Sequence, residues 1–241
     1  MRWICARCRF EYDDRPETCA GCLTPHSLVP LPVRVEGRDV ATQPRRRVGV
    51  VRADAMKPDT RRFPYGPPWD SWALGWPHAA LLVGPPGAGK STLASAMAAS
   101  AARQVEVLYL AVEEGHAVQL RDRLHRAGLT ELAARRLSIS DARTPTEVFD
   151  DLAGSKAQLV ILDSSTASGL APEAWTAAVA GRSWIATVHI NSQQTVYGGQ
   201  GWAHAADVVV FCKEGEAMPR KNRFGPMHSI NIWSEVNHAD E

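Results

Sequence analysis

The stretch "AALLVGPPGAGKST", which runs from Ala79 to Thr92, decides the fold of this chain. Residues Gly84 to Ser91 fit the pattern G-x-x-x-x-G-K-[ST]. They stand between an apolar run and a helical pattern, the setting in which this motif binds phosphate. Its glycines let backbone N–H groups face an anion, and the helix that follows adds its positive N-terminal end. The motif therefore predicts a nucleotide site; a Gly-rich structural turn is the alternative.

The residues of this motif have expected tasks. Lys90 would reach the β- and γ-phosphates of ATP, and the Ser91 hydroxyl would ligate Mg²⁺. A second metal ligand should end a buried strand, as Asp163 does in "LVILDSST"; a helix cap is the alternative role for such an aspartate. The predicted ATP contacts are Gly84, Pro85, Pro86, Gly87, Ala88, Gly89, Lys90, Ser91, Thr92 and Asp163.

Hydrolysis of ATP also needs a group that orients or activates water. The apolar run "VLYLAV" is followed by two adjacent carboxylates, Glu113 and Glu114, which repel each other at the tip of a strand. We therefore expect one of them to face the nucleotide and the other to face solvent. Glu113 is the predicted catalytic residue, and Glu114 is the alternative. A plain surface position for both is the remaining possibility.

Short apolar runs alternate with helical patterns after about residue 63. The runs are continuous, as expected for strands buried on both faces of a parallel sheet. They are "AALLVG", "VEVLYLAV", "QLVILD", "WIATVHI" and "DVVVFC", and the helical patterns are "STLASAMAASAAR", "HAVQLRDRLHRAG" and "TPTEVFDDLAG". The last pattern opens with a capping box from Thr144 to Glu147, with Pro145 at the first helical position. We predict an α/β fold with a mainly parallel sheet.

The composition is that of an ordinary globular protein. Hydrophobic residues make up 45% of the 241 positions and charged residues 22%. No apolar run approaches the roughly 20 residues of a membrane span, and the N-terminus does not read as a signal peptide. We therefore expect a cytoplasmic protein without membrane contact. Residues 1–62 hold 13 Lys and Arg against 8 Asp and Glu, which suggests an anionic partner or a merely soluble face.

Four of the five cysteines lie near the N-terminus. Cys5, Cys8, Cys19 and Cys22 form C-x₂-C-x₁₀-C-x₂-C, a spacing typical of a zinc ion held by four thiolates; disulfides are the alternative. We predict a zinc ribbon over residues 1–28, a basic linker rich in Pro and Arg over residues 29–62, and the nucleotide-binding core over residues 63–241. Cys212 is expected to be an inert core residue.

These motifs, in this order, resemble one family. A four-Cys ribbon, the phosphate-binding loop, "VLYLAVEEG", "LVILDS" and "KNRFG" are similar to those of the bacterial RadA (Sms) branch of RecA-like ATPases. The most specific of them is "KNRFG", from Lys221 to Gly225, because generic proteins with the same phosphate-binding loop lack it. The resemblance implies a RecA-like core. Family members usually carry a further C-terminal domain similar to the Lon protease fold, so the expectation is a short form without it.

The resemblance also implies a function. Members of this branch form hexameric rings that move along single-stranded DNA with ATP, often alongside a recombinase, and replication proteins are further possible partners. By the same resemblance, Lys221 and Arg223 would cross the subunit interface and contact the γ-phosphate of ATP bound to a neighbour. A solvated basic turn or a DNA contact is the alternative for these two cations. The implied cofactors are ATP, Mg²⁺ and Zn²⁺.

The loop after "WIATVHI" is the expected DNA contact, because in RecA-like cores this loop faces the central channel. It reads "NSQQTVYGGQGWAH", in which Tyr197 and Trp202 would stack on bases and three glycines would give mobility. The loop has neither Lys nor Arg, so an inert flexible loop is the alternative. The candidate γ-phosphate sensors are His189, Asn191 and Gln193, and the candidate DNA-backbone contacts are Arg45–Arg47, Arg61 and Arg62.

Three functions compete at this level. The first is a DNA-stimulated ATPase motor of recombination or repair. The second is an ATP-dependent switch, such as a helicase loader or regulatory ATPase, whose ribbon recruits a protein partner. The third is a small-molecule kinase, which would need a lid and an acceptor site that the sequence does not display.

Overall fold

The computed structural model describes residues 3–5, 11–12, 28–30, 60–190 and 200–237. The chain divides into two compact units, Met1–Pro44 and Arg45–Glu241. In the first unit, β1 (Trp3–Cys5) pairs antiparallel with both β2 (Glu11–Tyr12) and β3 (Leu28–Pro30). The strand β3 crosses the predicted boundary at residue 28. The other three ribbon cysteines, Cys8, Cys19 and Cys22, lie outside the described residues, so the zinc ribbon stays a prediction.

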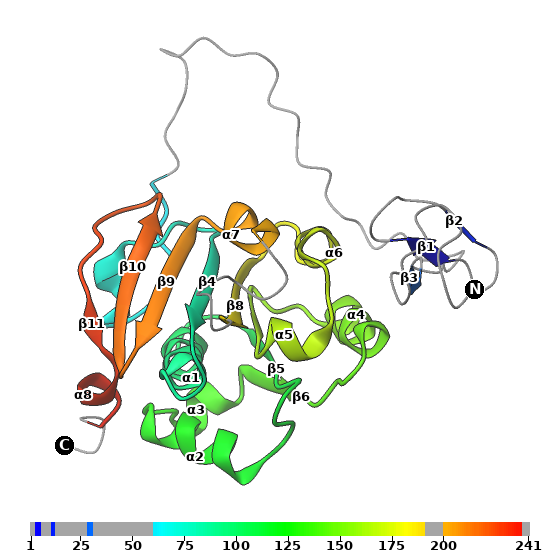
Figure 1. The fold of residues 1–241 in the computed structure, drawn as a ribbon. Coiled ribbons are helices and arrows are strands. Elements are labelled where there is room, and N and C mark those ends of the chain that lie inside the picture. The colour runs from blue at the N-terminus through cyan, green and yellow to red at the C-terminus, as the bar shows by residue number, and fades with distance from the viewer. Residues whose placement is uncertain (1–2, 6–10, 13–27, 31–59, 191–199, 238–241) are drawn as a thin grey trace. The chain divides into compact units, whose positions relative to one another are not determined.

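The second unit is built on one eight-stranded sheet, in the order β11-β10-β9-β4-β8-β7-β5-β6 (Figure 1). The six strands from β9 to β6 are parallel, whereas β10 and β11 continue the sheet antiparallel. The strands are β4 (Ala79–Gly84), β5 (Val107–Leu110), β6 (Leu137–Ser140), β7 (Leu159–Leu162), β8 (Ser183–His189), β9 (Val208–Lys213), β10 (Glu216–Asn222) and β11 (Ile230–Asn231). The predicted α/β fold with a mainly parallel sheet is confirmed.

Helices cover both faces of this sheet (Figure 1). One face packs against α1 (Lys90–Ala102), α2 (Val118–Arg126), α3 (Glu131–Ala134) and α8 (Ile232–Asn237). The other packs against α4 (Pro145–Gly154), α6 (Pro172–Ala178) and α7 (Gly201–Ala205), with the short α5 (Ser165–Ser168) after β7. The central strands are buried along their whole length because both of their faces are covered, which explains their continuous apolar runs.

The five predicted strands and three predicted helices are all present, within a few residues at each end. The predicted capping box is also present: Thr144 accepts from the Glu147 backbone, Glu147 reaches back to Thr144, and Pro145 opens α4. Three strands of the eight-stranded sheet escaped prediction. The short β6 and β11 lie at the two sheet edges, and β10 has the sequence "EAMPRKN", whose charged residues hide its two buried positions, Ala217 and Pro219.

The interpretation of Trp202 as a DNA-stacking residue is wrong. Its side chain is 2% exposed, and its ring packs edge-on against Trp184, which in turn packs edge-on against Trp175. A large aromatic side chain contributes most to the stability of the fold when it is removed from water. Trp202 therefore anchors α7 to the sheet.

The aromatic segment before β4 is also part of the core. Phe63, Tyr65, Trp69 and Trp72 are buried, and the last two lie on a 3₁₀-helix, Trp69–Trp72. In the described part of the chain, no helix combines the length and the apolar character that a membrane crossing requires.

Candidate functional site

The phosphate-binding loop joins the end of β4 to the start of α1. Gly87 and Gly89 have φ angles of 74° and 93°, a region that favours glycine. A Cβ atom on Gly84 would overlap the carbonyl oxygen of Cys212, so the end of β4 and the end of β9 approach closely only because residue 84 is glycine. The glycines of the motif are thus explained by backbone geometry.

Lys90 is the first residue of α1, and its side chain points back over this loop. The Lys90 residue is 5% exposed, and its ammonium group donates to the carbonyl oxygens of Gly84 and Pro85 at 3.0 and 2.8 Å. Burial lowers the pKa of this ammonium group, and the negative charges of Asp163 and Glu113 act against that shift. A phosphate group is a stronger acceptor than these neutral carbonyls.

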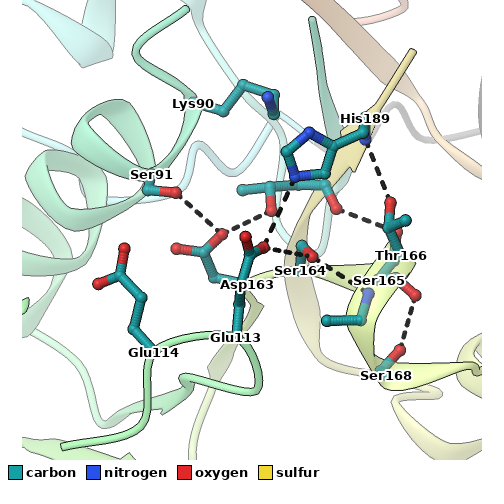
Figure 2. Close-up of polar contacts among 12 residues, drawn as sticks. Lys90, Ser91, Glu113, Glu114, Asp163, Ser164, Ser165, Thr166, Ser168 and His189 are labelled. Atoms are coloured by element: carbon teal, nitrogen blue, oxygen red, sulfur yellow. Dashed lines mark hydrogen bonds and ion pairs between the residues drawn. The ribbon is translucent and has the colours of Figure 1, made fainter. Parts of the chain in front are cut away.

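Asp163 follows β7 directly and accepts three hydroxyl hydrogen bonds. Ser91 and Thr187 donate to Oδ1 at 3.1 and 2.6 Å, and Tyr109 donates to Oδ2 at 2.7 Å (Ser91 and Asp163 in Figure 2). Burial, together with the charge of Asp163, raises the pKa of Tyr109 well above its ordinary value, so this hydroxyl keeps its proton. The structure brings Ser91 and Asp163 together, and their oxygen atoms are the kind of ligand that Mg²⁺ prefers.

Glu113 and Glu114 point in different directions from the tip of β5 (Figure 2). The Glu113 carboxylate accepts from the Ser164 hydroxyl at 2.9 Å and lies 3.6 Å from Nε2 of His189. The Glu114 carboxylate instead forms a bidentate ion pair with Arg123 of α2, at 3.1 and 2.7 Å. The two glutamates that the sequence left as alternatives therefore have different surroundings. Glu113 contacts Ser164, the residue next to Asp163, whereas Glu114 is paired with Arg123.

Arg143 holds the backbone of the same strand tip. Its Nη1 atom donates to the carbonyl oxygens of Val112 and Glu113 at 2.7 and 3.1 Å. A Cβ atom on Gly115 would lie only 2.5 Å from the Nη2 atom of Arg143, so a side chain at residue 115 would clash with the guanidinium group. Sequence reasoning missed Arg143 because it lies in the loop after β6, an unpredicted strand.

The other candidate phosphate sensors and DNA contacts are only partly described. His189 ends β8, and its backbone N–H donates to the Thr166 hydroxyl at 3.2 Å (Figure 2). Its ring lies beside Glu113, and its role as a phosphate sensor stays a prediction. Arg61 and Arg62 are exposed just before the aromatic segment and stay candidate DNA contacts. The remaining candidates, Asn191, Gln193, Tyr197 and Arg45–Arg47, lie outside the described residues.

The phosphate-binding loop follows the carboxyl end of β4, whereas the "KNRFG" segment lies near the amino ends of the parallel strands. Asn222 of β10 pairs with Val208 of β9, which pairs with Ala80 near the start of β4. Gly84 is four residues further along β4, or about 13 Å at ~3.3 Å per residue. Lys221 and Arg223 therefore lie away from the loop of their own chain.

Both cations have partners within the chain. The Lys221 ammonium donates to the carbonyl oxygens of Ala203 and Ala206 at the C-terminal end of α7, at 3.0 and 2.5 Å. Burial, followed by the positive charge of Arg223, lowers the pKa of Lys221. Arg223 forms an ion pair with Asp207 at 3.1 Å.

In the described part of the chain, no group of three or more His, Cys, Asp or Glu side chains is placed so that it could hold a metal ion. Cys212 is fully buried, and burial raises the pKa of its thiol to about 12, so it is an unreactive core residue as predicted.

Comparison with known proteins gives the family. A family model described as an AAA domain matches residues 37–221, which include the phosphate-binding loop, Glu113 and Asp163. The chain belongs to the AAA domain family. No curated protein sequence matches it significantly.

Solved structures resemble this AAA domain in architecture. The KaiC-like protein PH0186 from the hyperthermophilic archaeon Pyrococcus horikoshii OT3 is 19% identical, with a TM-score of 0.55 over 71% of this chain and 94% of that one. A second solved structure, described as an ATPase domain, is 13% identical, with a TM-score of 0.49 over 67% of this chain and 83% of that one. The fold is that of a RecA-like ATPase, and the AAA domain supports ATP hydrolysis.

Proposed function

We propose that this chain is an ATP-hydrolysing, DNA-binding protein of the RadA type, which acts as a ring on single-stranded DNA in recombination or repair. The observation that carries the proposal is the place of Lys221 and Arg223, at the sheet edge opposite the phosphate-binding loop. A cation at that edge serves ATP only when the nucleotide belongs to a neighbouring subunit. A ring places every such edge against a neighbour's loop.

The proposed chemistry divides among residues that lie at the carboxyl ends of the parallel strands. The loop residues Gly84–Ser91 and Thr92 bind the phosphates, with Lys90 on the β- and γ-phosphates. Ser91 and Asp163 hold Mg²⁺, and Glu113 orients the attacking water while His189 responds to the γ-phosphate. The separate environments of Glu113 and Glu114 support this choice, since Arg123 already neutralises Glu114.

Assembly of the proposed ring has to replace the intrachain contacts of Lys221 and Arg223 with contacts to a neighbour's nucleotide. In the single chain, Lys221 is bound to carbonyl oxygens and Arg223 to Asp207. A phosphate offers Lys221 an anionic acceptor in place of neutral carbonyl oxygens, and it can bind Arg223 in the bidentate geometry that arginine–phosphate pairs often adopt. The γ-phosphate of a neighbour is therefore a competitive acceptor for both side chains, and it would draw them across the interface.

The zinc ribbon belongs to the same proposal. Cys5 lies at the end of β1, in a short antiparallel sheet of the first unit, and the spacing of Cys5, Cys8, Cys19 and Cys22 suits one tetrahedral zinc ion. We expect about one zinc per chain, and we expect Cys19→Ser to lose it while ATP binding is retained. Fresh protein without zinc would refute this part.

One experiment tests the proposal as a whole: the ATPase rate per chain, measured against protein concentration with and without single-stranded DNA. The ring model predicts a specific activity that rises with protein concentration and rises further with DNA. A rate per chain that is independent of both would contradict it.

The second candidate is the ATP-dependent switch, which the finding on Trp202 favours. With Trp202 in the core, the proposed DNA loop loses one of its two aromatic residues. A switch would assemble and hydrolyse ATP but would not displace a DNA strand. A strand-displacement assay under conditions of full ATPase activity therefore separates the two functions.

A further inference from the structure

Trp233 is the largest apolar side chain that the described residues expose, at 41% of its surface. It is the second residue of α8, and Ile232 before it is fully buried. Because the neighbouring Ile232 is buried in the core, the backbone that carries Trp233 is held in place. The question is what such a ring does on the surface.

The ring lies on two glycines. A Cβ on Gly215 would overlap Nε1 of Trp233, and a Cβ on Gly89 would stand 3.2 Å from its Cη2 atom. Gly89 is the N-terminal cap of α1 and the last glycine of the phosphate-binding loop. The benzene end of the indole therefore touches the loop directly. A side chain at residue 215 would exclude the ring from its place, and one at residue 89 would crowd it.

The backbone around Trp233 is fixed by hydrogen bonds. Ile232 donates to the carbonyl oxygen of Gly215 at 2.6 Å, and the Asn231 side chain accepts from the backbone of Trp233 and Ser234 at 3.0 and 3.1 Å. Asn231 is itself paired to Glu216 through the β10–β11 ladder. The indole is thus positioned before any ligand arrives.

The direction of a bound nucleotide follows from Lys90. Its ammonium group lies over the carbonyl oxygens of Gly84 and Pro85, and this group binds the β- and γ-phosphates. The γ-phosphate end therefore points to the tip of β4, and the ribose and base leave the loop on the other side, past Gly89 and the first turn of α1. The exposed ring of Trp233 touches Gly89 on this path.

We propose that Trp233 is the stacking platform for the purine base of the bound nucleoside triphosphate, with Gly215 required to seat the ring and Gly89 in contact with it. The inference rests on the proposed nucleotide site. The flat face of an indole suits any base, because stacking needs a π-surface rather than a particular hydrogen-bonding edge. Trp233 therefore contributes affinity for the base and little discrimination between adenine and guanine.

Calorimetric titration tests this with three probes, Mg-ATP, Mg-GTP and inorganic tripolyphosphate, which has phosphates but no base. In Trp233→Ala we expect ATP and GTP to bind about 5- to 150-fold more weakly, with tripolyphosphate unchanged. Trp233→Phe should bind both nucleotides with intermediate affinity. Leu132→Ala, another exposed apolar position at 64%, is the matched control and should bind all three as wild type does.

Four outcomes would overturn the inference. Trp233→Ala could bind ATP as tightly as wild type, or it could weaken ATP and tripolyphosphate equally, in which case Trp233 only supports the loop. Phe211→Ala could weaken ATP in its place, which would put the base in the surface hollow of about 1030 Å³ beside Pro85 and Ile190. Wild-type protein that binds neither ATP nor tripolyphosphate would overturn the nucleotide site itself, and the inference with it.

Discussion

The carboxyl ends and the amino ends of the parallel strands, here called the carboxyl edge and the amino edge, use their charged residues in opposite ways. At the carboxyl edge, the ends of β4, β5, β7 and β8 bring Lys90, Glu113, Asp163 and His189 to one place, with hydroxyl groups between them. At the amino edge, Lys221, Arg223 and Asp207 neutralise one another or bind backbone carbonyls. The first edge is an arranged site, and the second is a set of satisfied contacts within one chain.

This difference indicates which groups for ATP hydrolysis a single chain would not bring to its own phosphate-binding loop. In the proposed mechanism the carboxyl edge supplies a phosphate-binding cation, a metal-binding carboxylate and a base, and Lys90 is the cation that the loop itself supplies for the triphosphate. The proposed additional cations are at the amino edge, about 13 Å away along β4 by strand geometry. If they take part, a second chain must bring its amino edge to the loop. The predictions below test each edge separately.

The largest expected effect concerns the amino edge. Arg223→Ala should lower the ATPase rate by a factor on the order of 10³–10⁵, the range for arginine fingers acting between subunits, while ATP affinity changes little. Arg220→Ala is the matched control, because Arg220 belongs to the same basic stretch but lies over the ring of Phe211, 5.9 Å from its centre.

Mixing two inactive variants decides whether Arg223 acts between subunits. Lys90→Ala removes the loop's cation, and Arg223→Ala removes the finger. A mixed interface pairs one intact loop with one intact finger, so a mixture should regain part of the activity. If wild type is oligomeric and mixtures regain nothing, the two edges do not cooperate, and Arg223 serves only its ion pair with Asp207.

The next effect compares two neighbours at the carboxyl edge. Glu113→Gln should bind ATP normally and hydrolyse it roughly 10²–10⁴-fold more slowly, as expected for loss of a general base. Glu114→Gln should cost much less, because its carboxylate is bound to Arg123 rather than directed at Ser164. Single-turnover rates with bound ATP measure both. A slow Glu114→Gln beside a normal Glu113→Gln would reverse the assignment.

A smaller effect is expected from Arg143, which we regard as a positioning residue for Glu113. Arg143→Ala frees the carbonyl oxygens of Val112 and Glu113, and a displacement of about 1 Å at a catalytic group costs up to ~10² in rate. Arg143→Lys should recover part of the rate, and Arg126→Ala on the surface of α2 is the control. In a Glu113→Gln background, Arg143→Ala should have little further effect, since it acts through Glu113. Additive losses would show an independent role.

The sequence predicted those parts of the molecule whose signals are local. The phosphate-binding loop, the capping box at Thr144 and the strand ending at Asp163 each lie in one short stretch with a known spacing. Contacts between distant segments left weaker signals. Tyr109 and Thr187 are polar residues inside apolar runs, and nothing in the sequence says that both donate to Asp163.

Trp202 and β10 show why the rest was not predictable. Trp202 follows a Gly-rich stretch, which suggested an exposed loop, yet burying its large ring against Trp184 stabilises the fold more than exposing it would. β10 is a strand because β9 and β11 lie on either side of it and complete its hydrogen bonds. Both outcomes depend on neighbours far away in the sequence, so a local pattern cannot contain them.

The last prediction concerns stability rather than catalysis, and it tests the response of the amino edge to acid. His78 precedes β4 at the amino edge, is 2% exposed, and contacts the Tyr65 hydroxyl at 3.1 Å and the Gly75 carbonyl at 3.1 Å. Burial lowers the pKa of His78 from 6.5 to about 4. The imidazole is therefore neutral in the folded protein and takes up a proton on unfolding at any pH between these two values.

The sign of the pH dependence follows from this proton uptake. The contribution of His78 to stability is complete above pH 6.5, decreases by about 1.4 kcal/mol for each pH unit below it, and stops changing below about pH 4. His78→Gln keeps a donor and an acceptor but does not titrate, so the difference in free energy of unfolding between wild type and this variant should narrow as the pH falls through that window. Urea denaturation from pH 8 to pH 4 measures the difference, with His125→Gln on the exposed side of α2 as the control. A difference that stays constant with pH would mean that His78 is not held neutral, and that acid does not weaken the amino edge through this residue.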